Sequence, residues 1–417
     1  MSELLPIEQA RARMLAAVQA VGASELVALP DLPGRILAAD VVSPCAVPPT
    51  DNSAMDGYAL RCADLAATTV FRVVGQALAG QPFTDVVARG ECVLITTGAS
   101  IPAGADTVVV KEQAEVSGVA GDNITSPTVR FNERVYGRQH AGQNIRRAGE
   151  DIAQGQTLVV AGHRCGPIDP GLLASVGRRE ARVARVLKVA LCATGSELIS
   201  PGEPLAAGQI YESNRYFLTA MLQRLGVSVI DLGVVPDHPQ LLRQAFVRGA
   251  AEADALIVTG GASVGEADYT RALLAELGAV DFWKVAIKPG KPFLFGTLQQ
   301  AVFFGLPGNP VSALVTFHQL VVPTLQKMQG ATATAPLILQ ATTTTAMARN
   351  RLRLDLQRGW LQSGHNGLPV VSADPQQGSG VLSAVSRSNC FILLEPGAQA
   401  VAAGAIVSVL PFDGLLM

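Results

Sequence analysis

The sequence predicts a multidomain protein that joins α/β and all-β units, with a doubly wound, mostly parallel α/β domain at its centre. The chain has 417 residues, of which 49% are hydrophobic and only 16% charged, so it is long enough for about two to four compact domains. From about residue 186, apolar runs typical of buried strands alternate with helical patterns. Short β patterns split by Gly and Pro lie on both sides of this part and indicate two further domains rich in strands.

The N-terminal part is expected to form a mixed α/β domain that a small β domain interrupts. Residues 6–20 combine helix-forming residues with apolar residues at helical spacing. Residues 49–141 contain short β runs such as T-V-F-R-V-V-G and T-V-V-V-K-E. Because residues 1–48 and 142–185 have mixed character and flank this stretch, we expect the β domain to be an insertion in the first domain.

Residues 186–330 show the pattern of the α/β domain. The run V-L-K-V-A-L-C-A-T-G is apolar almost throughout and ends in glycine, as is typical of a strand that is buried on both faces. Further apolar runs alternate with helical patterns over residues 212–225, 239–252, 269–277 and 311–328. Residues 292–326 contain no Asp, Glu, Lys or Arg, but three prolines interrupt them. We therefore interpret this stretch as buried strands and a helix, not as a membrane span.

Residues 331–417 are expected to form an all-β, barrel-like C-terminal domain. Apolar and polar residues alternate in segments such as L-R-L-D-L-Q-R-G and A-I-V-S-V-L-P-F, and Gly-Pro turns separate them.

The composition argues against several classes of function. The net charge is −2 and no arginine-rich arm occurs, so no nucleic-acid footprint is present. The six cysteines form no C-x-x-C pair and indicate reduced thiols, not a disulfide framework or a zinc site. The N-terminal residues include acids and no apolar core of the signal-peptide type. We expect a cytoplasmic protein that binds neither nucleic acid nor membrane.

A cluster of lysines suggests a binding site for an anion. Lys284, Lys288 and Lys291 surround a Pro-Gly turn in K-V-A-I-K-P-G-K-P. Each lysine ammonium is a compact charge with three donors. The following loop, G-L-P-G-N-P-V-S, adds backbone N–H groups and the start of a helix, which also favour an anion. A solvated turn followed by a tight αβ connection explains the same residues, and both readings stay open at this point.

Polar stretches follow several of the predicted strands, and ligands of doubly wound sheets bind at the carboxyl ends of strands. We expect five stretches to share this edge: Thr194–Glu197, Val235–Asp237, Gly260–Asp268, Lys288–Lys291 and Pro307–Ser312. The loop G-G-A-S-V-G-E-A-D offers backbone donors for a phosphate and carboxylates for Mg²⁺. It is neither a Walker A loop nor G-x-G-x-x-G. Each acid alone is equally compatible with helix capping, so the convergence carries the inference.

The N-terminal half contributes three further stretches. They are T-D-N-S-A-M-D-G-Y-A-L at 50–60, T-T-G-A-S-I-P-A-G-A-D at 96–106 and N-I-R-R-A-G-E-D-I at 144–152. A turn, a strand exit and a surface ion-pair cluster are the simple alternatives for these three. The five histidines show no ligand-type spacing, and neither G-x-S-x-G nor H-E-x-x-H occurs.

Taken together, these stretches resemble the molybdopterin molybdenumtransferase family (MoeA, related to the gephyrin E domain) over essentially the whole chain. The resemblance implies a MogA/MoaB-like α/β domain and a homodimer, with the site between the α/β domain of one subunit and the N-terminal and C-terminal regions of the other. The implied reaction in molybdenum cofactor biosynthesis inserts molybdate into adenylyl-molybdopterin, with Mg²⁺-dependent release of AMP.

The resemblance also assigns residues by their position in the shared motifs. The implied catalytic residues are Lys284, Lys288, Lys291, Asp56, Thr97 and Asp151. The implied substrate-binding residues are Glu197, Gly260, Gly261, Ser263, Pro307, Gly308, Pro310, Ser312, Arg358 and Ser379. Mg²⁺ is expected at Asp237, Asp268 and Glu197. Our hypothesis gives the oxyanion to Lys288, Lys291, Arg358 and Ser379, held by charge-assisted hydrogen bonds.

Two other functions remain compatible with the sequence. Close single-domain relatives of the α/β domain adenylate molybdopterin, so the chain is alternatively a molybdopterin adenylyltransferase. A non-enzymatic scaffold that binds molybdopterin is the other alternative. Other proteins of cofactor biosynthesis and apo-molybdoenzymes are the expected protein partners.

Overall fold

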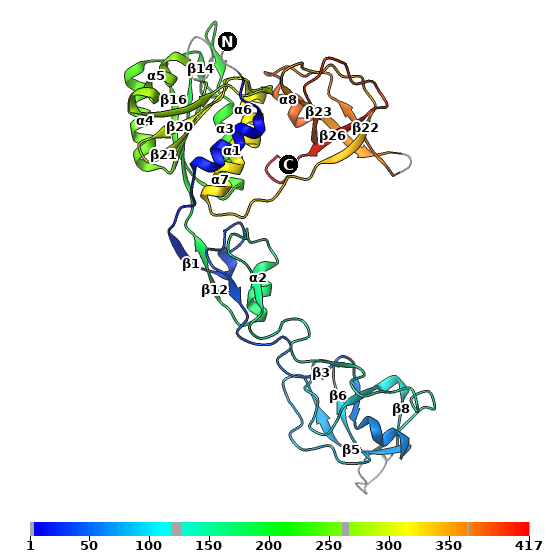
Figure 1. Ribbon diagram of the computed structural model, residues 1–417. Coiled ribbons are helices and arrows are strands. Elements are labelled where there is room, and N and C mark those ends of the chain that lie inside the picture. Colours follow the sequence, from blue (N-terminus) through cyan, green and yellow to red (C-terminus); the bar gives the residue numbers. More distant parts are fainter. Residues whose placement is uncertain (1–3, 118–126, 261–266, 365–366, 417) are drawn as a thin grey trace.

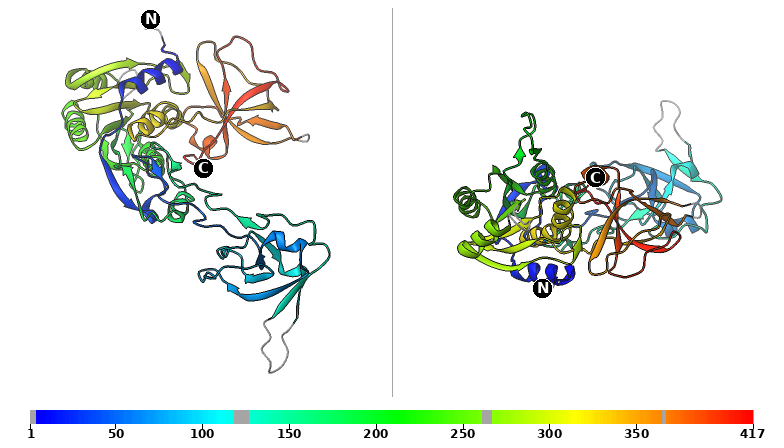
Figure 2. Two further views of the ribbon diagram at one scale, coloured as in Figure 1. Left: turned by 60° about the horizontal axis from the view of Figure 1, so that its bottom comes forward. Right: turned by 90° about the horizontal axis from the view of Figure 1, so that it is seen from above.

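The computed structural model describes residues 4–117, 127–260, 267–364 and 367–416, except for the side chains of residues 267, 268 and 283. The molecule is elongated (Figure 1). The α/β domain and the C-terminal barrel lie side by side at one end, and the inserted β domain lies at the other (Figure 2). A small domain connects the two ends.

The α/β domain is built on a six-stranded sheet with the order β16-β13-β17-β21-β20-β18. Four neighbouring strands run parallel and the last two are antiparallel, which confirms the mostly parallel sheet. The strands are β13 (Lys188–Thr194), β16 (Ser228–Val235), β17 (Ala255–Thr259), β18 (Gly278–Trp283), β20 (Leu294–Leu298) and β21 (Ala301–Leu306). The helices are α3 (Asn214–Arg224), α4 (Pro239–Glu252), α5 (Ala267–Leu277), α6 (Pro310–Thr316) and α7 (Val322–Met328).

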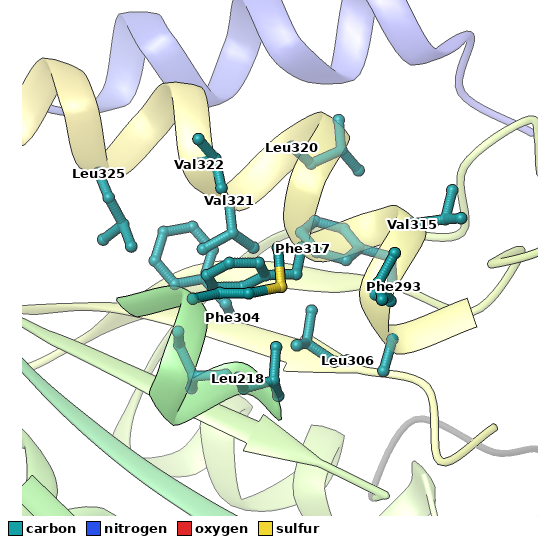
Figure 3. Packing of buried hydrophobic residues seen from close by; sticks show 14 of the residues in the cluster. Leu218, Phe293, Phe304, Leu306, Val315, Phe317, Leu320, Val321, Val322 and Leu325 are labelled. Carbon is teal, nitrogen blue, oxygen red and sulfur yellow. The ribbon is translucent and has the colours of Figure 1, made fainter. Parts of the chain in front are cut away.

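Helices cover both faces of this sheet because alternate residues of each strand point to opposite sides. In β13, Val189 and Leu191 belong to a core that also contains residues of α3, α6 and α7. Ala190 and Cys192 face the other core, with residues of α4 and α5. Phe293, Phe304 and Phe317 all belong to the first core (Figure 3), which contains more buried residues than the second.

The segment 311–328 was predicted as one helix and forms two, with a π-helical turn at Phe317–Val321 between them. Pro323 has no N–H, so it cannot donate to the carbonyl of Gln319 four residues earlier. The Arg11 Nε donates to that carbonyl over 3.2 Å instead. The proline therefore accounts for the irregular turn at this place.

Helix α1 (Ile7–Ala17) packs on the α/β domain, although the sequence placed it in the first domain. Its buried residues Ile7, Ala10 and Met14 join the core that contains α7. The first domain proper is made of β1 (Ser24–Ala28), β2 (Val41–Val42), β11 (Thr157–Val159), β12 (Glu180–Ala184) and α2 (Asp169–Ser175). Strands β1 and β12 pair with each other, as do β2 and β11.

The inserted β domain contains a six-stranded sheet with the order β7-β4-β6-β5-β9-β8. Its strands are β4 (Gly57–Leu60), β5 (Val70–Ala77), β6 (Glu91–Ile95), β7 (Thr107–Val110), β8 (Ala114–Ser117) and β9 (Thr128–Phe131). Two short pairs stand apart from the large sheets: β3 (Asn52–Ser53) with β10 (Ile145–Arg146), and β14 (Leu198–Ile199) with β15 (Ile210–Tyr211).

The C-terminal domain is a closed barrel, as predicted. Five strands pair in the cycle β23-β24-β22-β26-β25-β23. They are β22 (Leu339–Thr343), β23 (Leu354–Ser363), β24 (Pro369–Ala373), β25 (Cys390–Leu394) and β26 (Ile406–Pro411), and α8 (Leu382–Ser386) precedes β25. Strand β19 (Ile287–Lys288), which belongs to the lysine turn of the α/β domain, pairs with β23 and joins the two domains.

No helix in the part of the chain that the structure describes has the length and apolar character needed to cross a bilayer.

An ion pair anchors the start of the α/β domain. Arg185 donates two hydrogen bonds to Asp254, of 2.6 and 2.8 Å, and Lys188 N donates a third of 2.9 Å. Burial favours a higher pKa for Asp254, but the hydrogen bonds from Arg185 and Lys188 outweigh it, and the pKa lies below its usual value. The ionised carboxylate is therefore the form that stabilises the fold.

We predict that Asp254→Asn lowers the free energy of unfolding by about 1–3 kcal/mol at pH 7, since charged hydrogen-bond partners contribute about that much. The folded pKa is depressed, so the contribution is complete above the unfolded pKa of about 4 and is lost as the pH falls through the folded value. Urea unfolding at a series of pH values measures both effects. Glu252→Gln, which removes the exposed pair with Arg248, is the matched control and should change little. An equal loss in both variants would contradict the anchoring role.

Candidate active site at the strand ends of the α/β domain

A cavity of about 480 Å³ lies at the carboxyl ends of the parallel strands. Its walls come from the loops after β13, β17 and β21, from the segment that leads into α3, and from Gly380 of the C-terminal domain. Six residues that the sequence placed at the substrate site line it: Glu197, Gly260, Pro307, Gly308, Pro310 and Ser312. Of the five stretches expected at this edge, three therefore contribute to the cavity: Thr194–Glu197, Gly260 of the third stretch, and Pro307–Ser312.

Glycine makes the close approach of these loops possible. Gly260 has φ +109°, and a Cβ atom there would lie 2.0 Å from the Thr194 carbonyl oxygen. Only glycine accepts both the backbone conformation and the contact without a shift of the chain. The ends of β13 and β17 can therefore touch.

Buried hydrogen bonds tie the end of β17 and the head of α3 to the loop after β21. Asn214, the first residue of α3, donates from Nδ2 to Thr259 Oγ1 and to the Gly308 carbonyl, each over 2.8 Å. Thr259 Oγ1 donates to the Pro307 carbonyl over 3.2 Å. The head of α3 thus fixes the G-L-P-G-N-P loop that lines the cavity.

Three further polar residues of the cavity are Thr194, which lies in a stretch expected at this edge, and Glu212 and Asn214, which the sequence did not single out. All three are buried, with 2%, 2% and 6% of their surface exposed. Thr194 Oγ1, Glu212 Oε2 and Asn214 Oδ1 have no hydrogen-bond partner among the described residues. A buried polar atom without a partner is costly, so these atoms are suited to a bound molecule that carries donors. In the sequence, the Y-E-S-N stretch has the pattern of a helix start. Only the burial of its side chains beside a cavity indicates that it also lines a binding site.

Two expected metal ligands lie next to this cavity. Ser196 N donates to Asp237 Oδ2 over 3.1 Å, and Asp237 N donates to Ser196 Oγ over 3.3 Å, which ties the loop after β16 to the loop after β13. The carboxylate of Glu197 folds over Gly195, where a Cβ atom would lie 2.7 Å from Oε2. Half-buried carboxylates of this kind suit Mg²⁺, which prefers oxygen ligands. Gly261 and Ser263 lie outside the described residues, as does the side chain of Asp268.

The three lysines do not line the strand-end cavity, which differs from the single pocket that the sequence suggested. Lys288 Nζ forms an ion pair of 2.9 Å with Asp355 of the barrel, whose side chain is 3% exposed. Lys284 has a left-handed backbone (φ +92°), and its N–H donates to the Phe293 carbonyl over 3.1 Å. The turn faces the barrel because β19 leaves the sheet edge to pair with β23. Local sequence carries no sign of this pairing.

Lys291 lines a second cavity, of about 490 Å³, which we call the cationic cavity. Its other charged residues, Arg349, Arg351 and Arg353, precede β23 and were not singled out in the sequence. None of these four side chains forms an ion pair with the residues that the structure describes. Lys291 lines the cationic cavity and the next residue, Pro292, lines the strand-end cavity.

Arg358 and Ser379 connect the barrel to the strand-end cavity. Arg358 is 1% exposed, and its Nη2 donates to the carbonyls of Gln376 and Gly378 over 3.1 Å each. Val311 N at the start of α6 donates to the Ser379 carbonyl over 3.0 Å. Burial lowers the pKa of Arg358, although Asp374 and Asp355 act against this. Arg358 therefore supports the loop that supplies Gly380 to the cavity.

The remaining candidates belong to the inserted β domain and its junction. Thr97 donates to Asp56 Oδ1 from N and from Oγ1, over 2.8 and 2.9 Å, and Lys111 Nζ lies 3.2 Å from Asp56 Oδ2. The hydrogen bond from Thr97 N, then those from Thr97 Oγ1 and Lys111, lower the pKa of Asp56. Asp151 is exposed near the junction. This domain lies at the opposite end of the molecule from the strand-end cavity (Figure 1), so one chain does not bring the two groups together.

Family models match three consecutive parts of the chain. Residues 5–177 match the MoeA N-terminal region (domain I and II), and residues 190–327 match a probable molybdopterin binding domain. Residues 340–412 match the MoeA C-terminal region (domain IV).

Relatives of known name cover nearly the whole chain. The molybdopterin molybdenumtransferase of Haemophilus influenzae is 43% identical over 414 residues, which cover 99% of this chain and 100% of that protein. The protein of the same name from Bacillus subtilis is 31% identical, with coverage of 97% and 94%. Two crystal structures of molybdopterin biosynthesis MoeA proteins from Pyrococcus horikoshii are similar, with TM-scores of 0.81 and 0.82 at 29% and 25% identity. They cover 99% and 98% of this chain and all of their own.

We predict that Gly260→Ala destabilises the fold more than a glycine substitution of similar backbone geometry. Gly208→Ala is the matched control, because Gly208 has φ +85° and nothing within 4 Å of an added Cβ. The control should lose about 1 kcal/mol to backbone strain. Gly260→Ala should lose roughly 1–3 kcal/mol more, since the added atom overlaps the Thr194 carbonyl. Urea unfolding measures both variants, and equal losses would show that the close contact at the strand ends is not needed.

Proposed function

The chain belongs to the molybdopterin molybdenumtransferase (MoeA) family, and from this premise we propose that it inserts molybdate into adenylyl-molybdopterin with release of AMP. It is a transferase of molybdenum cofactor biosynthesis. In the proposed step the bond between the adenylyl phosphorus and its bridging oxygen breaks, and water takes that place, either directly or by hydrolysing an adenylyl-molybdate formed first, so that AMP leaves. The two dithiolene sulfurs then bind molybdenum while one molybdate oxygen leaves as water with the two thiol protons, and molybdenum stays at oxidation state +6. The observation that carries the proposal is the strand-end cavity, whose buried acceptors receive no hydrogen bond from the described residues.

The strand-end cavity is suited to the adenylylated pterin. Gly260 and the loop after β21 present backbone groups to the cavity, and phosphates bind well to such glycine-rich turns. Asn214 Oδ1 accepts no hydrogen bond from the described residues, and Glu212 Oε2 has only an ion-pair contact of 3.6 Å with Arg215 Nε. We assign to them the N–H groups of a nitrogen heterocycle, because a buried acceptor gains most from such a donor.

The cations at the border with the barrel are suited to the tetrahedral dianion. Lys288 remains 41% exposed beside Asp355, so its ammonium can also contact a ligand. Lys291 and the arginines of the cationic cavity form a field that attracts anions toward the strand-end cavity next to it. In this scheme Arg358 positions the Ser379 loop more than it contacts the substrate, because its guanidinium is buried and donates to that loop.

Asp237 and Glu197 are the described residues that would hold Mg²⁺, together with Asp268. When bound, the ion offsets the charge that develops on the diphosphate as it is cleaved. The chain itself orients Asp237 through the two hydrogen bonds with Ser196, so the carboxylate is in place before the ligand arrives. No protein nucleophile is required.

We further propose that the protein acts as a homodimer in the cytoplasm and that a second copy completes each site. Asp56, Thr97 and Asp151 lie at the end of the chain's own fold that is remote from its cavity, yet Thr97 and Lys111 hold Asp56 ionised in an exposed position. A partner chain in reversed orientation would bring this carboxylate to the strand-end cavity.

All six cysteines are free thiols, which is consistent with a reducing compartment. Apo-molybdoenzymes are the proposed acceptors of the product.

The first test of function supplies adenylyl-molybdopterin, molybdate and Mg²⁺ and follows AMP release. The variant is Lys288→Met combined with Asp355→Asn, because Lys288→Met alone would leave a buried carboxylate unpaired. We expect the loss of about 2–4 kcal/mol of transition-state stabilisation, which is roughly 30- to 900-fold in kcat/KM.

Lys188→Met is the control for this test, since Lys188 lies at the amino end of β13, opposite the cavity, and should keep full activity. Full turnover by the double variant would remove Lys288 from the scheme. Formation of the adenylate from molybdopterin and ATP by the wild-type protein, without AMP release in the first assay, would make the chain an adenylyltransferase instead.

The second test asks whether two chains share one site. Asp56→Ala and the Lys288→Met/Asp355→Asn variant are expressed together with different tags, and the mixed dimer is purified. If the site is shared, one site of the mixed dimer carries both defects and the other carries none, so about half of the wild-type AMP release should return. Both parent homodimers should keep only the residual activity of their own defect. A mixed dimer as inactive as its parents would mean that each chain forms its own site.

A further inference from the structure

Three metal-ligating side chains form a cluster in the first domain, away from the proposed active site. Donor atoms of His163, Cys165 and Asp169 all lie within 4.8 Å of one another. The imidazole, thiolate and carboxylate groups of these residues are all zinc ligands. The sequence alone showed no ligand-type spacing around His163. The cluster forms only because the segment 163–165 and the start of α2 fold against each other.

An extended segment places His163 and Cys165 on the same side of the chain. Leu37 N donates to the His163 carbonyl and Cys165 N donates to the Arg35 carbonyl, each over 2.9 Å. In an extended chain, residues two apart point to the same face. Arg164 between them points the other way, where its guanidinium binds the Gln329 side chain over 2.7 Å.

Asp169, at the start of α2, faces these two residues. Its Oδ2 lies 2.8 Å from His163 Nε2 and accepts a hydrogen bond of 2.6 Å from Gly166 N. The carboxylate is thus oriented by the backbone, as metal ligands commonly are. The side chain of Asp169 is 16% exposed and that of His163 40%, so the cluster is open to solvent on the histidine side.

The thiol of Cys165 closes the inner side of the cluster. The residue is 3% exposed and packs in the apolar core of the first domain with Leu37 and Leu173. Burial raises the pKa of Cys165 to about 11, so the thiol keeps its proton at neutral pH when no metal is near. Its sulfur has no hydrogen-bond partner among the described residues.

We propose that His163, Cys165 and Asp169 bind one zinc ion, with a water molecule as the fourth ligand. The ion replaces the hydrogen bond between His163 Nε2 and Asp169 Oδ2, whose separation of 2.8 Å widens to roughly 3.4 Å, and the ligating neutral imidazole carries its proton on Nδ1. The thiol releases its proton to solvent, so one proton leaves for each zinc bound. With zinc–ligand bonds of about 2.0–2.3 Å, donor atoms of a tetrahedral site lie roughly 3.4 Å apart, so the widest pair closes by at most roughly 1.5 Å.

The mixed donor set separates this site from the carboxylates at the strand ends. Mg²⁺ prefers oxygen ligands throughout, whereas thiolate and imidazole favour zinc. A bound ion would link the segment 163–165 to α2 in a domain whose paired strands β2 and β11 have only two and three residues. Zinc is therefore expected to stabilise the domain between the two ends of the molecule.

The experiment uses the full-length protein, stripped with a chelator and desalted. Zinc is titrated against a competing chromophoric indicator, and metal content after desalting is measured by mass spectrometry. We expect one zinc per chain, one proton released per zinc in weak buffer, and a higher thermal midpoint with zinc than without. Co²⁺ in place of zinc should give the near-ultraviolet charge-transfer band of a cobalt–thiolate bond.

Cys165→Ala and His163→Gln are the test variants, and Cys45→Ala and His140→Gln are matched controls outside the cluster. Each test variant should weaken zinc binding by more than about 100-fold, since even a second-shell change costs about 10- to 100-fold. The controls should bind zinc like the wild type. Absence of a retained zinc ion, equal affinity in Cys165→Ala, or a cobalt complex without the thiolate band would each overturn the proposal.

Discussion

The contact between the ends of β13 and β17 is the constraint on which the strand-end cavity depends. Gly260 touches the Thr194 carbonyl because it has no Cβ. This contact sets how closely the loop after β21 can approach the end of β17. Gly308 then packs on Gly260, and Asn214 bonds to the Gly308 carbonyl and to Thr259. The parallel order of the strands brings four chain ends to one edge, and the glycines turn that edge into a cavity with backbone walls.

The second constraint is the joint between the α/β domain and the barrel. A hairpin of the sheet edge sends β19 into the barrel, where Lys288 meets the buried Asp355. The carboxylate needs a cation, because a buried charge without a partner is costly. The same lysine therefore contributes to domain contact and to the positive field beside the cavity. Val311 N completes the joint from the other side through the Ser379 carbonyl.

Features that depend on local periodicity could be predicted from the sequence, and features that depend on distant pairing could not. The helix over 239–252 and the alternation of strands and helices were found because apolar spacing records them directly. Helix α1 lies on the α/β domain because it packs against residues hundreds of positions away in the sequence. Lys288 and Lys291 lie toward the barrel because β19 pairs with a strand of another domain. Glu212 and Asn214 were overlooked for a related reason, since a polar residue at a helix start already has a local explanation.

The first domain has a mechanical role that follows from its position between the two ends. It separates the strand-end cavity from Asp56 and Thr97, so its rigidity sets how far those residues lie from the cavity of their own chain (Figure 1). Its own strands are short, and it is held to the α/β domain by polar contacts such as those of Arg164 with the Leu225 carbonyl and Gln329. The extended segment that carries Arg164 on one side carries His163 and Cys165 on the other. A metal ion on that side would stiffen the segment 163–165, which also anchors the first domain to the α/β domain. The ion would therefore strengthen both the first domain and its contact with the α/β domain.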